Sequence, residues 1–149
     1  MKAVIFDTVG RPLRVGDRPD PTPAPDEVVL RVAACGICGS DLHMSVDPEP
    51  FGITGDFVLG HEIAGEVVAT GGGVDTLKAG DLVAVVPMRG CGHCPRCLAG
   101  DPARCPDMTL IGGGYADYVC VAARQCRVLP DGVAASDAAL AEPLSVALH

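Results

Sequence analysis

The sequence predicts a mainly β domain, and three observations support this fold class. The 149-residue chain contains 19 glycines and 13 prolines, which are typical of many turns and short strands rather than long helices. Along Glu27–Ala34, Val28, Leu30 and Val32 alternate with Val29, Arg31 and Ala33, as expected for a strand. Four prolines fall between Pro19 and Pro25, where no helix or central strand tolerates them. The length is sufficient for one domain with its own hydrophobic core.

The strands are expected to be short and separated by turns. The first two should pair across the turn at residues 10–12, and the proline-rich segment 19–25 should be an extended connector rather than a domain boundary. Gly-rich turns separate most of the later strands. The predicted strands are Lys2–Phe6, Leu13–Val15, Glu27–Ala34, His61–Thr70, Leu82–Val86, Tyr115–Ala122 and Arg127–Leu129.

Helical structure is expected at a few places only. A short turn is predicted at Ser40–His43, with Ser40 or Asp41 as its N-cap. Near the C-terminus, Ser136 can cap a run that continues to Ala141. Pro143 suits the first turn of a second helix through His149. That helix has no terminating glycine, so we expect the chain to stop within an element.

Charge and composition exclude several classes of function. The formal net charge of -8 argues against binding to a nucleic-acid backbone, which needs a basic face. No stretch approaches the roughly 20 apolar residues of a membrane-spanning helix. The N-terminal segment from Met1 to Asp7 is too soon interrupted to be a signal peptide. We therefore expect a cytoplasmic protein with no nucleic-acid or membrane partner.

Four of the eight cysteines form a compact motif. Cys91, Cys94, Cys97 and Cys105 follow the pattern C-x2-C-x2-C-x7-C. Four thiolates that converge on one ion make a closed zinc site with a structural role, which would replace a core that this Pro- and Gly-rich segment cannot build. An iron–sulfur cluster, a redox disulfide and inert thiols remain alternatives, since spacing alone does not exclude iron. We refer to residues 90–107 as the cysteine lobe.

A second, sparser set of candidate ligands lies elsewhere in the chain. A catalytic zinc takes three protein ligands of mixed type and leaves one position open. Cys38, His61 and a carboxylate from Glu62 or Glu142 meet that requirement. Spacing alone is a weak signal here, because an isolated cysteine after a strand is usually a small core residue.

The chain resembles the zinc-dependent medium-chain dehydrogenases over its entire length. Gly39 after Cys38, with Glu142-Pro143 later, is similar to the branch of polyol, sugar, butanediol and threonine dehydrogenases. Simple alcohol dehydrogenases more often carry Arg or His at position 39, where it contacts the cofactor pyrophosphate. The matching segments are Cys35–His43, Gly60–Glu66 with the glycines at 71–73, the cysteine lobe, Gly113–Tyr118 and Glu142–His149.

This resemblance implies a fold and a chemistry. The fold would be a GroES-like, partly open β-barrel with a projecting structural-zinc lobe and short C-terminal helices. Cys38 and His61 would be firm ligands of a catalytic zinc, with Glu62 or Glu142 as the carboxylate. About two zinc ions per chain are therefore expected. The parent enzyme would oxidise a secondary alcohol or polyol to its ketone with NAD or NADP.

The resemblance also assigns catalytic roles. Ser40 would take the hydroxyl proton and pass it towards His43, and Asp41 would orient His61. Each residue has a simpler interpretation. Ser40 and Asp41 are common capping residues, His43 can be an exposed loop residue, and Glu142 suits the first turn of a helix. Residues 44–59 would border the substrate.

No dinucleotide-binding G-x-G-x-x-G pattern occurs in the chain. We therefore treat residues 1–149 as the catalytic domain, with the Rossmann cofactor domain expected after His149 in a longer protein. We assign no cofactor-binding residue here and expect no useful turnover from this chain alone. The full-length protein is expected to be a homo-oligomer. A non-enzymatic, zinc-stabilised scaffold and an iron-containing electron carrier are the competing functions.

Overall fold

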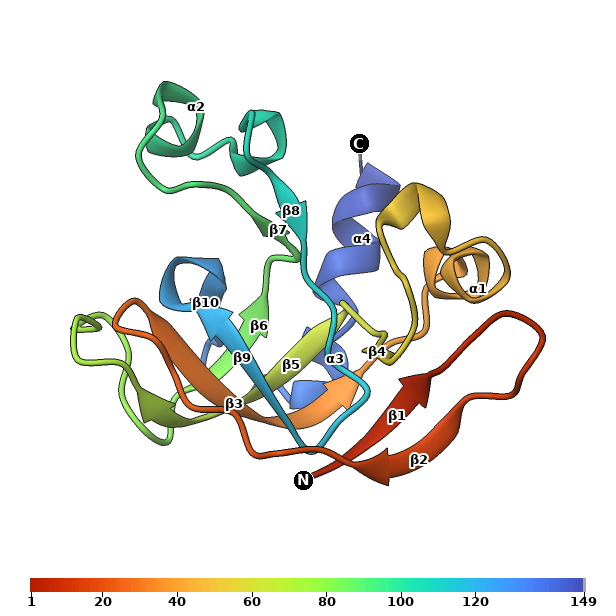
Figure 1. Ribbon diagram of the computed structural model, residues 1–149. Coiled ribbons are helices and arrows are strands. Elements are labelled where there is room, and N and C mark those ends of the chain that lie inside the picture. The colour runs from red at the N-terminus through yellow and green to blue at the C-terminus, as the bar shows by residue number, and fades with distance from the viewer. Residues whose placement is uncertain (149) are drawn as a thin grey trace.

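The computed structural model describes residues 1–148, which form a mainly β structure with short helices (Figure 1). The described residues contain three sheets, and the largest has the strand order β10-β6-β5-β3-β9. All its pairings are antiparallel. The expected mainly β, open-sheet fold is thus confirmed. The strands of this sheet are β3 (Glu27–Cys35), β5 (Ile63–Thr70), β6 (Leu82–Val85), β9 (Tyr118–Ala122) and β10 (Cys126–Val128).

A smaller sheet, with the order β2-β1-β4, adjoins the large one. It consists of β1 (Lys2–Phe6), β2 (Arg14–Asp17) and β4 (Phe57–Val58). The segment that precedes β9 joins the two sheets, because Val4 N–H donates to the Tyr115 carbonyl at 2.7 Å and Val32 N–H donates to the Asp117 carbonyl at 2.9 Å. The two sheets therefore curve around one interior and form a partly open barrel.

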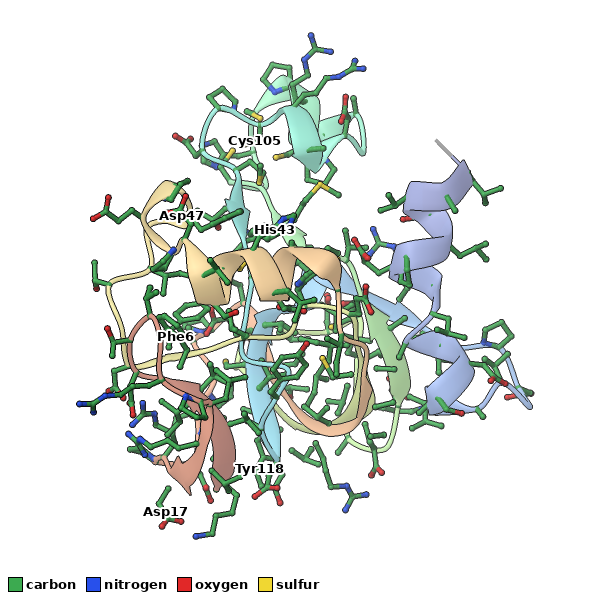
Figure 2. The ribbon with its side chains drawn as sticks, turned by 90° about the vertical axis from the view of Figure 1, so that its right-hand side faces the viewer. Phe6, Asp17, His43, Asp47, Cys105 and Tyr118 are labelled. Atoms are coloured by element: carbon green, nitrogen blue, oxygen red, sulfur yellow. The ribbon has the colours of Figure 1, made fainter. Side chains whose placement is uncertain are left out.

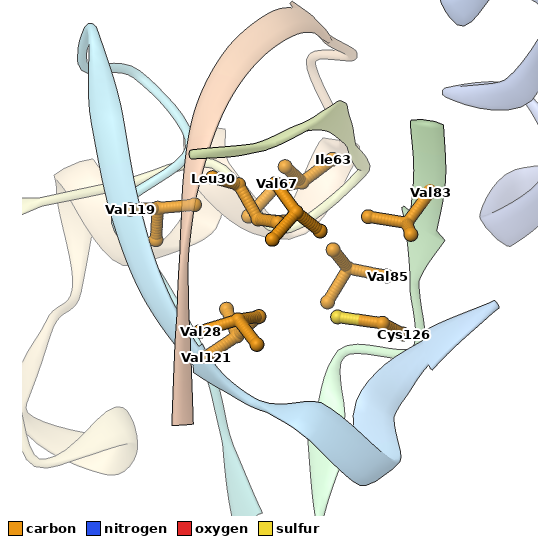
Figure 3. Packing of buried hydrophobic residues seen from close by; sticks show 9 residues of the cluster. All are labelled: Val28, Leu30, Ile63, Val67, Val83, Val85, Val119, Val121 and Cys126. Atoms are coloured by element: carbon orange, nitrogen blue, oxygen red, sulfur yellow. The ribbon is translucent and has the colours of Figure 1, made fainter. Parts of the chain in front are cut away.

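The main core lies inside this barrel and is built almost entirely from valine, leucine and isoleucine. Side chains from all five strands of the large sheet face one another across the interior (Figure 3). Leu30, Val67 and Val83 are fully buried. Burial of such a side chain stabilises a fold by roughly 1.5–3 kcal/mol relative to exposure. Alternation within the strands thus sets which residues enter the core, as predicted for Glu27–Ala34.

The cysteine lobe projects from the barrel (Figure 1). Its base is a two-stranded ladder of β7 (Met88–Arg89) and β8 (Thr109–Leu110), and its loop carries the helices α2 (Pro95–Leu98) and η2 (Pro102–Arg104). In Figure 2 the lobe, marked by Cys105, lies at one end of the molecule, and the hairpin marked by Asp17 lies at the other. Apart from its four cysteines, the buried or half-buried residues of the lobe are Gly90, Gly92, Asp101 and Pro102, so the lobe has little apolar core of its own.

The first helix is longer than the predicted turn. Helix α1 spans Gly39–Val46, and its N-cap is Cys38 rather than Ser40 or Asp41, which corrects the predicted cap. Asp41 occupies the third helical position, and its carboxylate accepts a hydrogen bond from the Cys38 N–H at 2.9 Å. The helix continues because Met44 is buried among apolar side chains of the smaller sheet and its loops. The 3-10 turn η1 (Glu49–Phe51) follows.

The two predicted C-terminal helices are present with shifted ends. Helix α3 spans Ala135–Ala138, and its N-cap is Ala134 rather than Ser136, so that predicted cap is wrong. Helix α3 packs through Ala138 and Ala139 against Ala64 of β5. Helix α4 spans Ala141–Leu148 and holds Pro143 in its first turn, as predicted. The predicted continuation to His149 lies outside the described residues.

Most strand predictions are confirmed with small changes at their ends. Strand β2 begins at Arg14 and extends to Asp17, β5 begins two residues later than predicted, and β9 begins at Tyr118 because residues 115–117 bond to two different strands. The 3-10 turn η3 (Ala123–Gln125) separates β9 from β10. Among residues 1–148, no helix combines the length and apolarity that crossing a membrane would demand.

Candidate metal centres and the adjoining cavity

The four cysteines of the lobe converge on one point. Ligand atoms of all four lie within 4.8 Å of one another. The sulfurs of Cys91 and Cys97 are 4.0 Å apart, and those of Cys94 and Cys105 are 3.8 Å apart. A regular tetrahedron with zinc–sulfur bonds of about 2.3 Å has edges of about 3.8 Å. The sulfurs are therefore already placed at the spacing of a four-thiolate zinc site.

Backbone N–H groups surround these sulfurs. Cys91 Sγ accepts from the Cys94 N–H at 3.3 Å, and Cys94 Sγ accepts from the Cys97 N–H at 3.4 Å. Cys105 Sγ accepts from the N–H groups of Cys91 and Asp107. Hydrogen bonds from the backbone at His93 and Cys94 lower the pKa of Cys91 to about 6. In the same cluster, the Gly92 backbone lowers the pKa of Cys97, but burial and the neighbouring thiols outweigh it and raise that pKa to about 12. Without a metal, the thiolate form is therefore favoured at Cys91 and opposed at Cys97.

An ion pair and a hydrogen bond from Arg124 hold the base of the lobe against the barrel. Arg89 in β7 lies 3.0 Å from Glu27, and Arg124 lies 2.9 Å from Asp26. Arg124 also donates to the Gly90 carbonyl at 2.7 Å, directly before the first cysteine of the motif. The neighbouring carboxylates of Asp26 and Glu27 therefore help to hold the β7 side of the lobe, Glu27 directly and Asp26 through Arg124.

A second donor set gathers where β3 ends and β5 begins. Ligand atoms of Cys38, His61 and Glu62 all lie within 4.8 Å of one another, and we call these residues the three-donor site. Cys38 caps α1, whereas His61 and Glu62 directly precede β5. His61 and Glu62 are each only 5% exposed, and Cys38 is half-buried. Sequence-distant residues are thus brought together by the pairing of β3 with β5.

A buried carboxylate fixes the orientation of His61. Asp41 Oδ1 lies 3.5 Å from His61 Nδ1, which leaves Nε2 as the nitrogen free to bind a metal. The same carboxylate accepts hydrogen bonds from the Cys38 N–H at 2.9 Å, the Gly60 N–H at 3.1 Å and the Tyr115 hydroxyl at 2.8 Å. Asp41 therefore occupies the position that the resemblance implies, beside His61.

These contacts raise the pKa of His61 and lower the pKa of Asp41, so both side chains are charged near neutral pH in the metal-free site. The hydrogen bond to Asp41 is the main reason that the pKa of His61 is raised to about 9, and burial opposes it. Burial would raise the pKa of Asp41, but the bonds from His61, Cys38 N–H, Tyr115 and Gly60 outweigh it and lower that pKa to about 2. Asp41 is thus ionised throughout the neutral range.

Sequence reasoning missed the part played by Tyr115. Its hydroxyl donates to Asp41 and lies 3.1 Å from the Gly36 carbonyl, although the chain separation is 74 residues in the first case. No local spacing could reveal this contact, because it depends on how the segment before β9 crosses β1. Its only sequence signal is a tyrosine directly after a run of glycines.

Two glycines make room for this arrangement. A Cβ at Gly36 would collide with the Glu62 carboxylate. Gly60 has a φ of +88°, and a Cβ there would lie 2.6 Å from the ring of Tyr115. Only glycine accommodates both this backbone conformation and that close approach. The glycines beside the donors are thus part of the geometry of the site.

The other predicted site residues lie around the three-donor site rather than within it. Ser40 and His43 lie three residues apart on α1 and so share one face, with Ser40 half-buried and His43 exposed. Figure 2 shows His43 on this helix. Glu142, in the first turn of α4, is outside the converging donor set. Burial raises its pKa, and nearby His61 and Glu62 act on it in opposite directions.

The remaining three cysteines lie outside both converging donor sets. Burial raises the pKa of Cys35, Cys120 and Cys126 to about 12 in each case. Cys120 donates to Glu27 at 3.2 Å, and Cys126 belongs to the main core. All eight cysteines are free thiols among the described residues.

A cavity of about 420 Å³ opens next to the three-donor site. His61, Asp41 and Gly60 form one end of it. The other walls come from α1, from the loop around η1, and from residues 108–112 at the base of the lobe. Its volume lies within the roughly 300–1,000 Å³ of small-molecule sites. The candidate metal ligand His61 therefore faces a space large enough for a small organic molecule.

Comparison with known proteins identifies the family of this chain. Residues 24–131 match the family model described as the alcohol dehydrogenase GroES-like domain. The chain is 37% identical to a sorbitol dehydrogenase of Bacillus subtilis (strain 168), over 100% of this chain and 44% of that protein. The chain thus spans less than half the length of this relative.

Solved structures show the same fold. The crystal structure of galactitol-1-phosphate dehydrogenase from Escherichia coli matches with a TM-score of 0.90 at 38% identity, covering 100% of this chain and 44% of that one. An acetophenone reductase from Geotrichum candidum NBRC 4597, solved in complex with NAD, matches with a TM-score of 0.81 at 38% identity, covering 93% and 42%.

Proposed function

Because this chain belongs to the alcohol dehydrogenase GroES-like domain family of the zinc-dependent medium-chain dehydrogenases, we propose that it is the catalytic domain of an NAD(P)-dependent oxidoreductase. Its reaction would interconvert a secondary alcohol or polyol and the corresponding ketone. The observation that carries the proposal is the convergence of Cys38, His61 and Glu62 beside a cavity of small-molecule size.

Both donor sets fit zinc. Four thiols at tetrahedral spacing suit a closed structural site, and a cysteine, a histidine and a carboxylate suit a site with an open position. We propose Cys91, Cys94, Cys97 and Cys105 as ligands of the first ion, and Cys38, His61 and Glu62 as ligands of the second. The charges of His61 and Glu62 act on the pKa of Glu142, and we therefore propose Glu142 as an alternative carboxylate ligand.

In the proposed reaction, zinc supplies Lewis-acid activation of the alcohol or carbonyl oxygen. Asp41 holds the ring of His61 so that its free nitrogen points away from the carboxylate. Ser40 accepts the hydroxyl proton of the alcohol and passes it to exposed His43 and then to solvent. Oxidation of the alcohol to the ketone would also remove a hydride from its carbon, and a bound NAD(P)⁺ would supply the hydride acceptor.

Several features of the whole protein are part of the same proposal. The nicotinamide cofactor would be held by a Rossmann domain, since residues 1–148 present no dinucleotide-binding fold and the matched relatives are more than twice as long. We propose a cytoplasmic location because eight free thiols are typical of a reducing compartment. We also propose that the full-length protein is a homo-oligomer.

Metal analysis tests this function most directly. The purified chain should contain about two zinc ions per molecule. His61→Ala should remove one of them, and the matched control His93→Ala, an exposed lobe histidine, should remove none. Cys91→Ser should remove the other ion, whereas Cys120→Ser should not.

An activity assay distinguishes the proposed dehydrogenase from a non-enzymatic scaffold. The full-length protein should reduce NAD or NADP in the presence of a secondary alcohol, and His61→Ala should abolish this activity. A single zinc ion per chain, lost in Cys91→Ser but kept in His61→Ala, would instead support a non-enzymatic, zinc-stabilised scaffold. Bound iron would support an electron carrier.

A further inference from the structure

The cavity beside His61 is lined mainly by apolar side chains. Nine of its lining residues carry apolar side chains. They come from three separate parts of the chain, which are helix α1, the segment from η1 to the residue after β4, and strand β8 with the residue on each side of it. Among those nine are Met44, Phe51, Ile53, Phe57, Leu59 and Leu110.

At the base of the cavity the apolar side chains belong to a buried cluster, and at its mouth they are partly exposed to solvent. Met44, Ile53 and Leu59 are buried and form one cluster with Phe6. Phe51 and Leu110 are 47% and 45% exposed, so they stand at the mouth of the cavity. The base is therefore preformed by the core, and the mouth presents apolar side chains to any molecule that enters.

Polar side chains on the wall have little capacity to bind hydroxyl groups. Among the described lining residues they are Asp41, His61 and Thr109. Both oxygens of the Asp41 carboxylate already accept hydrogen bonds, from Cys38, Gly60 and Tyr115. His61 is a proposed metal ligand, and Thr109 is exposed in β8. The wall thus offers His61 of the three-donor site and almost no other side chain that is free to form hydrogen bonds.

A polyol would be poorly accommodated against such a wall. Each of its hydroxyl groups is hydrogen-bonded in water, and each one buried without a partner carries a free-energy cost. An apolar substituent gains from the same burial. We infer that the substrate of the proposed dehydrogenase is a secondary alcohol, or its ketone, with a compact apolar aryl or branched alkyl substituent that lies against this wall. This inference rests on the proposed function and selects one substrate class within it.

Binding to the zinc-loaded 149-residue chain tests the inference without any turnover. 1-Phenylethanol and sorbitol serve as the probes, and amide resonances of residues around the cavity, such as Gly60 and Gly112, report occupancy. We expect 1-phenylethanol to shift these resonances with a Kd at least about tenfold lower than that of sorbitol. Equal or tighter binding of sorbitol would overturn the inference, as would no shift with 1-phenylethanol.

A matched pair of variants locates the binding. Leu110→Asn places a polar group at the cavity mouth and should weaken 1-phenylethanol binding by about tenfold. Leu82→Asn is the control, because Leu82 is also a strand leucine of similar exposure, 40%, but lies outside the cavity. Unchanged binding in Leu110→Asn, with native spectra for both variants, would show that the probe sits elsewhere and would contradict the inference.

Kinetics of the full-length protein distinguish this inference from the proposed function. A kcat/KM for 1-phenylethanol at least about 100-fold above that for sorbitol supports both the inferred substrate class and the proposed function. Preference for sorbitol would overturn the substrate class and leave the dehydrogenase function standing. Binding of 1-phenylethanol in the cavity without oxidation of any alcohol by NAD or NADP would support the ligand class and contradict the proposed function.

Discussion

The hydroxyl of Tyr115 lies 2.8 Å from Asp41 Oδ2, and this contact joins the segment before β9 to the first turn of α1. Through Asp41 it reaches His61, whose Nδ1 lies 3.5 Å from the other oxygen of the carboxylate. The orientation of the histidine therefore depends on a side chain from a distant part of the sequence. Residues that orient metal ligands in this way affect metal affinity without touching the ion.

Tyr115→Phe should loosen this arrangement while it keeps the aromatic ring. Loss of this partly buried hydroxyl, which contacts both Asp41 and the Gly36 carbonyl, should lower the free energy of unfolding by about 1 kcal/mol. Zinc should dissociate from the three-donor site up to about tenfold faster, which is the lower end of the effect of such orienting residues. A chelator competition assay measures this rate. Tyr118→Phe is the matched control, and equal rates in the two variants would show that Tyr115 acts through packing alone.

Glu62→Gln and Glu142→Gln should differ in their effect on zinc. Glu62 belongs to the converging donor set and is 5% exposed, whereas Glu142 lies outside that set on α4. Glu62→Gln should weaken zinc binding at the three-donor site by at least about tenfold, and Glu142→Gln should weaken it less. Zinc titration of each variant gives the comparison. The opposite ranking would identify Glu142 as the ligand.

The cysteine lobe should depend on its metal for order. Within residues 90–107 the packing is sparse, so ion binding replaces an apolar core. Cys105→Ser or chelation should therefore increase amide hydrogen exchange throughout the lobe. The main core should be far less affected, because its strands pair independently of the lobe. Uniform loss of protection in β3 and β5 would contradict this separation.

The stability of the metal-free chain should depend on pH through His61. Its pKa is raised from 6.5 to about 9, chiefly by the hydrogen bond to Asp41. The stabilisation is thus fully present below about pH 6.5 and is lost as pH rises through about 9. The difference in Tm between the parent chain and His61→Gln should therefore shrink over this interval. A constant difference would show that the pair contributes no pH-dependent stability.

At acidic pH, the stability of the metal-free chain should depend on the titration of Asp41. The pKa of Asp41 is lowered from 3.8 to about 2, because the hydrogen bonds from His61, Cys38, Tyr115 and Gly60 outweigh the effect of burial. Its contribution is present above about pH 3.8 and is lost as pH falls through about 2. Asp41→Asn should accordingly flatten the acid limb of the stability curve, whereas Asp47→Asn on the exposed end of α1 should leave that limb unchanged.

The sequence predicts features that depend on short separations. The lobe cysteines lie within 15 consecutive residues, so their spacing alone indicates a shared ion. Alternation along β3 likewise identifies the strand and its buried face. The Cys38–His61 pair required the family resemblance, because only the pairing of β3 with β5 brings these residues together.

Other features could not be read from local patterns. Ser40 is a better N-cap than cysteine by intrinsic preference, yet Cys38 caps α1 because Asp41 accepts its N–H. The strands β7 and β8 have only two residues each and carry no periodicity to detect. The Tyr115–Asp41 bond spans 74 residues and depends on how both sheets are joined.

The closeness of the four lobe cysteines along the chain has a consequence for how the protein is made. Their ladder, β7 with β8, is complete once residue 110 has been synthesised, so the lobe can capture its ion while later residues are still on the ribosome. The barrel cannot close until β9 and β10 have been synthesised. Likewise, Asp41, the partner of His61, lacks its hydrogen bond until Tyr115 has been synthesised. If the lobe binds the proposed ion, this ion would be the first to be acquired, before the nascent chain has closed its barrel.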